Sequence, residues 1–316
     1  MINKNSKIYL AGHKGLIGSA ILRKLSSLNY SNIFFKSKNQ LDLRDQKKVY
    51  NYLNKIKPDA VIIAAAIVGG IKVNNTKKAD FIFDNLSIQN NIIHGSYMAG
   101  VKSLVFLGSS CVYPKNCRLP IKEEYLLSGY LEKTNEPYAV AKIAGINLCS
   151  SYNYQYNVNY KSLMPCNSFG INDNYDLQSS HFLPALIRKS IDAITNKKNH
   201  IKIWGSGKPL REVIYSDDVA DACIYFLKKK TKESLINVGS GIEKTVNEYA
   251  KFIMSHLQVD LKIIHENKNL DGTYRRLLDS SLAKKYGWLA KTSLETGIST
   301  TVNNYIENYI LKKTIK

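Results

Sequence analysis

A glycine-rich loop between two apolar segments constrains the fold of this chain more than any other feature of the sequence. Residues 7–11 form a short apolar run that predicts a buried strand, and Gly12-His13-Lys14-Gly15-Leu16-Ile17-Gly18 follows it directly. Residues 19–28 then repeat apolar side chains with the period of a helix. In such a Gly-x-x-Gly-x-x-Gly loop, the first glycine permits a tight turn, the second lets the backbone approach a pyrophosphate, and the third lets the helix pack closely on the strand. Because amides at a helix N-terminus favour phosphates, the loop predicts a dinucleotide-binding fold.

Strands and helices alternate through the first half of the chain. Apolar segments predict further strands at residues 32–35, 61–66 and 103–107, and a long helix at residues 84–99. This alternation predicts an α/β fold with a Rossmann-type, doubly wound parallel sheet. Ligands of such sheets bind outside the carboxyl ends of the strands. The small residues that end one predicted strand would leave room for a cofactor; they are Ala64, Ala65 and Ala66.

The second half of the chain predicts a smaller, mostly helical substrate domain. We expect residues 1–166 and about 212–240 to form the dinucleotide-binding domain, because a strand at residues 234–238 should return to the large sheet. Residues of about 167–211 and 241–316 then form the substrate domain.

The segment after the second predicted strand bears on the choice of cofactor. A dinucleotide fold that selects NAD usually has an acidic residue there, whereas this chain has Lys36-Ser37-Lys38. Two cations and a hydroxyl suit a ribose 2′-phosphate, so we expect NADPH; the alternative is that both lysines are merely solvated. Asp42 or Leu43 could contact the adenine.

Tyr138 and Lys142 are the candidate proton-transfer pair. They stand four residues apart in a helix-compatible run, so they would share one helix face. A free tyrosine titrates near ~10, and a nearby cation should lower its pKa and make it a usable proton donor. Ser109, Ser110 and Cys111 follow the strand at residues 103–107, where a hydroxyl could hold a substrate carbonyl oxygen. The alternative is that the tyrosine and lysine are two ordinary residues on a solvated helix face.

Composition limits the other classes of function. The net charge is +20, but the basic residues are spread along the chain, and no nucleic-acid-binding motif is present. A basic surface also suits anionic nucleotides. The five cysteines have no metal-like spacing, so we expect reduced thiols and no metal. The N-terminus has no apolar signal region and no apolar run reaches membrane length, so we expect a cytoplasmic protein that binds neither nucleic acid nor membrane.

Beyond these local patterns, the chain resembles the GDP-L-fucose synthase family of extended short-chain dehydrogenases/reductases. The resemblance runs through nearly the whole sequence. It rests on Ala11-Gly12-His13-Lys14-Gly15, Val68-Gly69-Gly70-Ile71, Gly108-Ser109-Ser110-Cys111-Val112-Tyr113-Pro114, Asn135-Glu136-Pro137-Tyr138-Ala139-Val140-Ala141-Lys142, Ser180-His181-Phe182-Leu183-Pro184-Ala185-Leu186, Trp204-Gly205-Ser206-Gly207, Pro209-Leu210-Arg211-Glu212 and Asp271-Gly272-Thr273.

The resemblance implies an NADPH-dependent 4-reductase and 3,5-epimerase of a GDP-linked 4-keto sugar, acting as a homodimer in nucleotide-sugar biosynthesis for surface polysaccharide. The family's reductase residues correspond to Ser109, Tyr138 and Lys142, and its epimerase acid/base pair to Cys111 and His181, as thiolate and imidazolium. The implied cofactor contacts are Gly12, His13, Gly15, Leu16, Ile17, Gly18, Lys36, Ser37, Lys38, Ala64, Ala65, Ala66, Tyr138, Lys142, Pro165, Asn167 and His181. The implied substrate contacts are Ser109, Ser110, Cys111, Arg188, Lys189, Trp204, Arg211 and Asp271.

Several residues depart from the family's pattern around the expected sugar pocket, so the identity of the sugar stays open. The departures are Cys166, Ser168, Phe169, Ile171, residues 176–180, Tyr215-Ser216 and Tyr274. One alternative is a reductase without epimerase activity that acts on a GDP-4-keto-heptose. Another is a dinucleotide-binding regulator without catalysis, in which Cys111 is a small buried residue and His181 a structural one. Trp204 could border the guanine or belong to the core, and Asp217-Asp218 is expected to cap the next helix.

Overall fold

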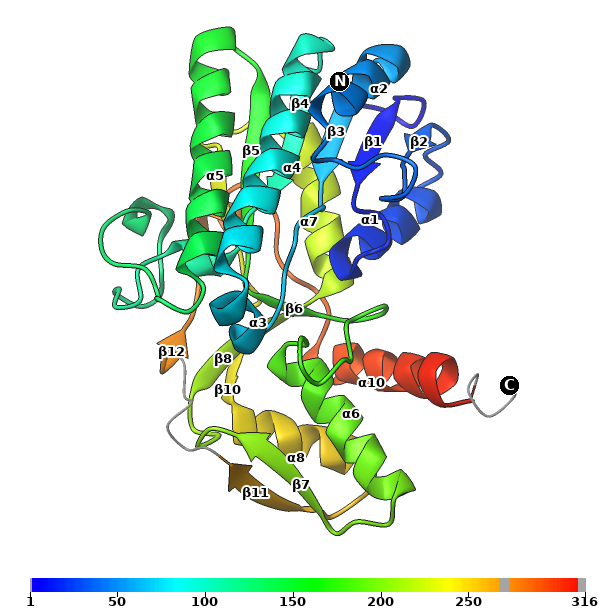
Figure 1. Cartoon of the computed structure of the whole chain (residues 1–316), viewed down its shortest axis with the longest axis vertical. Helices are drawn as coiled ribbons and strands as arrows, with labels where there is room; N and C mark the ends of the chain where they lie inside the picture. Colours follow the sequence, from blue (N-terminus) through cyan, green and yellow to red (C-terminus); the bar gives the residue numbers. More distant parts are fainter. Residues whose placement is uncertain (1, 267–272, 312–316) are drawn as a thin grey trace.

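A six-stranded parallel sheet forms the centre of the larger of two packed units (Figure 1). The computed structural model describes residues 2–266 and 273–311. The strand order is β2-β1-β3-β4-β5-β9, and every pairing is parallel. The predicted doubly wound fold is therefore confirmed. The strands are β1 (Ile8–Ala11), β2 (Ile33–Phe34), β3 (Ala60–Ile63), β4 (Ser103–Leu107), β5 (Asn159–Pro165) and β9 (Leu235–Val238).

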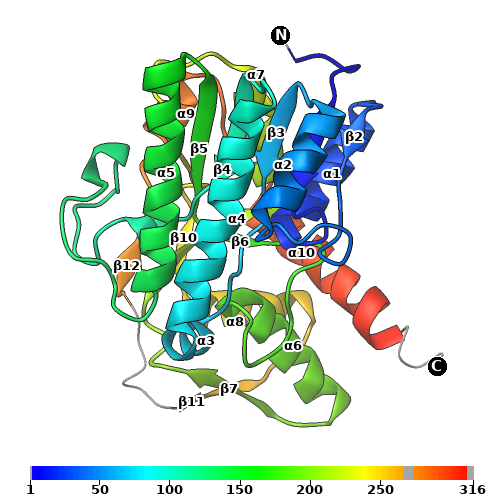
Figure 2. The same cartoon turned by 45° about the horizontal axis from the view of Figure 1, so that its top comes forward.

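Helices cover both faces of this sheet, which explains why its central strands are continuous apolar runs. On one face, α1 (Leu16–Ser27) packs against α7 (Ser216–Lys228). On the other face, α4 (Lys78–Met98) lies between α2 (Gln46–Ile56) and α5 (Glu136–Tyr156), as Figure 2 shows. A short helix, α3 (Ile71–Thr76), precedes α4.

Three predicted boundaries differ from the structure in ways that affect the cofactor edge. Helix α1 begins at Leu16 rather than at residue 19, so the last glycine of the loop lies inside the helix. Strand β3 ends at Ile63, which leaves Ala64–Ala66 in the following loop. Helix α4 begins at Lys78, six residues before its predicted start, because Phe81 is already buried in its first turn.

The smaller unit lies beyond the carboxyl ends of the large sheet and has its own apolar core (Figure 1). Its strand β8 (Leu210–Tyr215) pairs with β6 (Asn167–Phe169), β10 (Glu243–Thr245) and β12 (Arg275–Arg276). A second sheet joins β7 (His200–Trp204) to β11 (Lys262–Glu266). The helices are α6 (Phe182–Thr195), α8 (Val246–His256), α10 (Leu294–Tyr305) and the π-helical turn η4 (Ile306–Leu311).

The chain returns to the larger unit once more near its end. Leu278, Ala283 and Trp288 pack in the larger core, and α9 (Ser281–Lys285) lies against β9. The predicted domain boundaries place these three residues in the substrate domain. The boundaries stay a prediction, and this part of the chain packs on the larger unit instead. Among the helices of residues 2–266 and 273–311, none combines the length and the apolar character needed to span a membrane.

Candidate active site

The three glycines of the first loop differ in what surrounds them. Gly12 has φ +88°, and a Cβ there would lie 2.6 Å from the amide nitrogen of Ala65. A Cβ on Gly18 would lie 1.9 Å from the carbonyl oxygen of Gly12. A Cβ on Gly15 would meet no protein atom closer than 3.6 Å, and Gly15 directly precedes α1. Packing within the protein thus requires the first and third glycines. The space in front of the second, at the amides of α1, fits a pyrophosphate.

The loops after β1 and β3 meet at the point where the strand order reverses. The amide of Ala64 donates to the carbonyl oxygen of Ala11 at 2.9 Å, and Ala65 lies against Gly12. Ala64, Ala65 and Ala66 are half-buried, and the loop continues to Ile67, whose backbone is bonded at both ends to Asn85 of α4. This edge is the usual ligand site of an open α/β sheet.

The predicted phosphate-selecting segment lies at the carboxyl end of β2. Lys36 and Lys38 are exposed, and Ser37 is half-buried. The Lys36 ammonium lies 5.9 Å from the centroid of the Tyr52 ring, and the Lys38 charge acts on Asp42. Both side chains are exposed, as a site for a 2′-phosphate requires, and as solvated lysines also are. Their binding of a 2′-phosphate therefore stays a prediction.

Three chain segments bring the candidate reductase residues together. Ser109 follows β4 and precedes the turn η1 (Ser110–Val112), and its Oγ accepts a 3.4 Å hydrogen bond from the amide of Cys111. The Ser109 hydroxyl also favours the charged forms of its neighbours, since it lowers the pKa of the Tyr138 phenol and that of the Cys111 thiol. Tyr138 and Lys142 stand on successive turns of α5. A hydroxyl, a phenol, a thiol and an amine therefore share one site.

Close packing of α5 on β4 positions the lysine. A Cβ on Gly145 would lie 2.6 Å from the Phe106 ring, so glycine lets the helix approach the strand. Gln89 of α4 donates to the carbonyl oxygen of Ala141 at 2.5 Å. Lys142 is then buried, with its Nζ donating to the carbonyl oxygen of Leu107 at 2.9 Å and lying 4.6 Å from the Phe106 ring centroid.

Burial dominates the charge states of this pair. Burial raises the pKa of Tyr138, the nearby Cys111 raises it further, and the hydrogen bond from Ser109 opposes both. Burial lowers the pKa of Lys142 to about 8. The prediction that the ammonium lowers the pKa of the phenol is therefore wrong, because desolvation dominates and the ammonium donates to the carbonyl oxygen of Leu107.

Cys111 and His181 favour the uncharged forms. Burial raises the pKa of the Cys111 thiol, against the effects of Ser109, Arg276 and Lys142. His181 immediately precedes α6 and is exposed to solvent, and desolvation by the protein atoms around its ring lowers its pKa. Epimerisation by a Cys111 thiolate and a His181 imidazolium stays a prediction, and burial works against both charged forms. The segment before His181 lies against the loop after β3, since the amide of Gly70 donates to the carbonyl oxygen of Ser179 at 2.9 Å.

Of the four cationic and aromatic substrate candidates, two come together. The Nζ of Lys189 lies 5.2 Å from the centroid of the Trp204 ring, and Trp204 is 45% exposed, which removes the alternative that it belongs to the core. Arg188 instead donates to the carbonyl oxygen of Tyr175 at 2.9 Å and pairs with Asp192 of its own helix.

Arg211 turns toward the segment that leads into β12. Its Nη1 donates to the carbonyl oxygens of Leu210 at 2.8 Å and of Thr273 at 2.7 Å. Asp271 lies outside the described residues. Pro165 is the last residue of β5, which runs parallel to β4, so it lies at the same end of the sheet as the carboxyl end of β4. Asn167 follows two residues later and donates its Nδ2 to the carbonyl oxygen of Glu212 at 3.0 Å.

Asp217 and Asp218 hold neighbouring segments together instead of capping α7. Asp217 and Asp218 lie in the first turn of α7, where negative charge is favourable. Their carboxylates do not cap the helix. Asp217 pairs with Arg23 at 2.5 Å, and Asp218 accepts from the amides of Lys291 and Thr292 at 3.1 and 3.0 Å.

Arg276 is a site residue that sequence reasoning missed. Its Nη1 donates to the carbonyl oxygen of Ser110 at 2.6 Å, and its charge acts on Cys111. The only signal in the sequence is its place shortly after Asp271-Gly272-Thr273, and nothing there connects it to a turn more than 150 residues earlier.

Comparisons with known proteins agree with this geometry. The NAD dependent epimerase/dehydratase family matches residues 8–239. A GDP-L-fucose synthase of Sinorhizobium fredii is 46% identical over 302 residues, which cover 96% of this chain and 96% of that protein. The structure of a GDP-6-OMe-4-keto-L-xylo-heptose reductase from C. jejuni superposes with a TM-score of 0.90 and 35% identity, covering 97% of this chain and 99% of that chain. A GDP-L-fucose synthetase from Naegleria fowleri bound to NADP has a TM-score of 0.89 and 29% identity, covering 98% and 96%. The chain therefore belongs to the NAD dependent epimerase/dehydratase family and, within these extended short-chain dehydrogenases/reductases, to the GDP-L-fucose synthase family.

Proposed function

We propose that this protein is an NADPH-dependent 4-reductase of a GDP-linked 4-keto-6-deoxy sugar, and that it also epimerises the sugar at C3 and C5, as GDP-L-fucose synthases do. The observation that carries the proposal is that Ser109 and Cys111 act on the phenol of Tyr138, while the buried Lys142 lies 5.8 Å from its ring centroid and donates to the last residue of β4. The identity to a GDP-L-fucose synthase over nearly the full chain supports the substrate class.

The cofactor proposal rests on the residues of the glycine loop and β2. The loop at Gly15 and the amides of α1 would hold the pyrophosphate, and Lys36 and Lys38 would hold the 2′-phosphate. A relative of the same fold binds NADP. When bound, NADPH supplies the hydride for C4 of the sugar.

Side chains of the protein would then donate the proton and stabilise the negative charge on the C4 oxygen. Ser109 and Tyr138 would hold the C4 oxygen, and Tyr138 would give its proton to that oxygen as negative charge develops. Oriented donors stabilise this charge, and a fixed geometry supplies much of the rate. Lys142 would hold the nicotinamide ribose and offset the charge left on the phenol.

Epimerisation would use Cys111 and His181. The C4 ketone acidifies the hydrogens at C3 and C5, so one group must remove each proton and another must return it. Because both side chains favour their neutral forms, the neutral imidazole is a competent base, and a thiol is a competent acid. Arg276 and Lys142 both favour the thiolate form of Cys111, so this residue could also act as the base that removes a proton from the sugar.

A second candidate is a reductase without epimerase activity that acts on a GDP-4-keto-heptose. The fit to a GDP-6-OMe-4-keto-L-xylo-heptose reductase favours it, as do the departures from the family's pattern, Tyr215 and Tyr274 among them.

One substrate panel separates the two candidates. NADPH oxidation is followed with GDP-4-keto-6-deoxymannose and with GDP-4-keto-heptoses, each with and without an added epimerase. Deuterium uptake at C3 and C5 is measured in heavy water without NADPH. Turnover of the deoxyhexose with uptake at both carbons supports the first candidate. Turnover of a heptose only after the separate epimerase has acted, without uptake, supports the second, and no NADPH oxidation with any sugar would leave a dinucleotide-binding regulator.

We further propose that the enzyme is a cytoplasmic homodimer. The five cysteines are free thiols, which suits a reducing compartment. Phe83 of α4 and Val140 of α5 are exposed apolar side chains on the two helices that would form the dimer bundle. Light scattering of the purified protein, compared with a Phe83→Glu variant, tests the assembly.

A further inference from the structure

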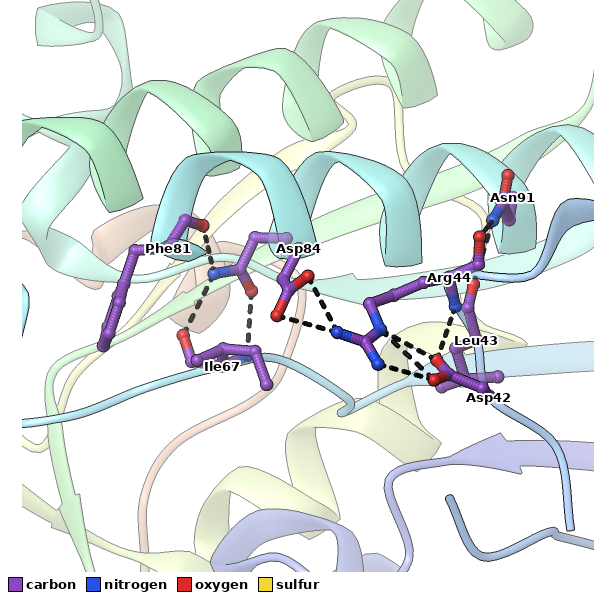
Figure 3. A network of polar contacts seen from close by, with 8 residues as sticks. Asp42, Leu43, Arg44, Ile67, Phe81, Asp84 and Asn91 are labelled. Atoms are coloured by element: carbon purple, nitrogen blue, oxygen red, sulfur yellow. Dashed lines mark hydrogen bonds and ion pairs between the residues drawn. The ribbon is translucent and has the colours of Figure 1, made fainter. Parts of the chain in front are cut away.

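An arginine in the segment between β2 and α2 joins two carboxylates (Figure 3). The Nε of Arg44 donates to both carboxylate oxygens of Asp42, at 3.0 and 3.2 Å, and its Nη2 donates to Oδ2 at 2.7 Å. Its Nη1 reaches both oxygens of Asp84 on α4, at 3.2 and 3.3 Å. One guanidinium therefore offsets one of two negative charges and joins the loop to the helix.

The main chain of this loop is fixed independently of the guanidinium. Asn91 of α4 donates its Nδ2 to the carbonyl oxygens of Leu43 and Arg44, each at 3.0 Å. Figure 3 shows these contacts along one side of α4, with Ile67 of the loop after β3 at the other end of the same row. Because Asn91 already holds the loop, the ion pairs of Arg44 are not needed to keep the backbone in place.

The negative charge of Asp42 interacts with Lys38, one of the two lysines predicted to bind the 2′-phosphate. Asp42 lies four residues after Lys38, and the charge of Lys38 acts on it. A free carboxylate near the ribose selects NAD by binding the 2′-hydroxyl, and it repels a 2′-phosphate. The hydrogen bonds from Arg44 lower the pKa of Asp42 to about 2, so this carboxylate is ionised at any physiological pH.

We propose that Arg44 is the residue that lets this site prefer the phosphorylated cofactor, by engaging Asp42 and Asp84 and leaving Lys38 to the 2′-phosphate. The proposal rests on the proposed NADPH dependence of the enzyme. Arg44 acts as a positioning residue here: it holds the Asp42 carboxylate, which also interacts with the charge of Lys38, in a closed ion pair. Removing it would leave both carboxylates without this cation and would free Asp42 to attract Lys38.

Binding of NADPH and NADH to the full-length protein, without sugar, tests the proposal. Arg44→Leu should weaken NADPH binding roughly tenfold while changing NADH binding less than about twofold. The double variant Arg44→Leu with Asp42→Asn should restore most of the lost preference, because it removes the freed charge. Arg23→Leu is the matched control, since Arg23 loses an ion pair with Asp217 of similar exposure on the other face of the sheet.

The outcomes distinguish this inference from the proposed function. Equal weakening of both cofactors by Arg44→Leu would show a merely structural role and overturn the inference, as would an unchanged preference. Failure of the double variant to recover the preference would overturn the charge argument. A wild-type protein that binds NADH as well as NADPH would instead contradict the proposed cofactor, and the role of Arg44 would fall with it.

Discussion

The ammonium nitrogen of Lys142 lies 2.9 Å from the carbonyl oxygen of Leu107 and 5.8 Å from the centroid of the Tyr138 ring. The lysine is thus anchored to the end of β4 rather than to the phenol four residues before it. Burial lowers the pKa of Lys142 to about 8, so the amine is close to titration at neutral pH. A buried cation held by one carbonyl can readily offset a new negative charge beside it. We therefore infer that its effect on Tyr138 arises when substrate and cofactor are bound.

Tyr138→Phe should lower reductase turnover by a factor of about 100 or more, which is the usual contribution of a positioned general acid. NADPH binding should stay within about twofold, because the Tyr138 ring would keep its edge contact with Phe81, whose centroid lies 6.3 Å away. Single-turnover NADPH oxidation and a fluorescence titration measure the two effects. Near-normal turnover would remove the phenol from the proposed mechanism.

Gly15→Ala should weaken NADPH binding at least about tenfold and leave the fold intact. The backbone of Gly15 has φ −76° and ψ 170°, which alanine adopts freely, and the new Cβ meets no protein atom closer than 3.6 Å. Only a bound pyrophosphate would collide with it. Isothermal titration and urea denaturation measure the affinity and the free energy of unfolding.

Gly18→Ala is the counterpart of that variant, with the opposite expectation. Its Cβ would lie 1.9 Å from a backbone oxygen, so α1 must shift, and the free energy of unfolding should fall by about 1–3 kcal/mol or more. A stable Gly18→Ala protein, or an unstable Gly15→Ala protein, would contradict this assignment of the glycines.

Local spacing explains what the sequence could predict about this site. The glycine loop and the Tyr138–Lys142 pair lie within one turn or two of a single element, so period and order suffice to place them. Contacts between distant segments leave no such pattern: Arg276 reaches Ser110 across 166 positions. The charge states of Tyr138 and Cys111 depend on how much protein surrounds them, which no motif encodes. The predicted direction of the Tyr138 pKa was therefore wrong, because desolvation raises it.

Arg276→Gln should make the Cys111 thiol less reactive. Arg276 and Lys142 are the cations that oppose the effect of burial on this thiol, so removing one should raise its pKa further. Glutamine keeps a donor for the carbonyl oxygen of Ser110. The rate of alkylation of Cys111 by iodoacetamide, resolved by peptide mass spectrometry across pH, measures the effect without any substrate.

The neighbouring arginine provides the control for that experiment. Arg275 pairs with Glu243 on β10, so Arg275→Gln removes the same charge one position away but not from the thiol. Its alkylation profile should match the wild type. Equal profiles for all three proteins would show that Arg276 only holds the turn.

Asp173→Asn should stabilise the protein at about pH 8 and have little effect near pH 4. Asp173 is buried; its Oδ1 accepts from the amide of Asn174 at 2.7 Å, and its Oδ2 has no hydrogen-bond partner in the described part of the chain. Burial raises the pKa of Asp173 from 3.8 to about 7, so the folded protein holds the proton that the unfolded chain releases between these values.

Stability therefore falls as pH rises through this window, because the unfolded state binds fewer protons there than the folded state. The rise in the pKa of Asp173 corresponds to a loss of roughly 4 kcal/mol at most in the free energy of unfolding. Asparagine avoids this cost, and its Oδ1 keeps the hydrogen bond from the Asn174 amide. Urea denaturation of both proteins at several pH values should show a difference in the free energy of unfolding that grows from about pH 4 to about pH 7 and then levels off. A constant difference across that range would mean that Asp173 is ionised in the folded protein at low pH, with a partner for its second oxygen.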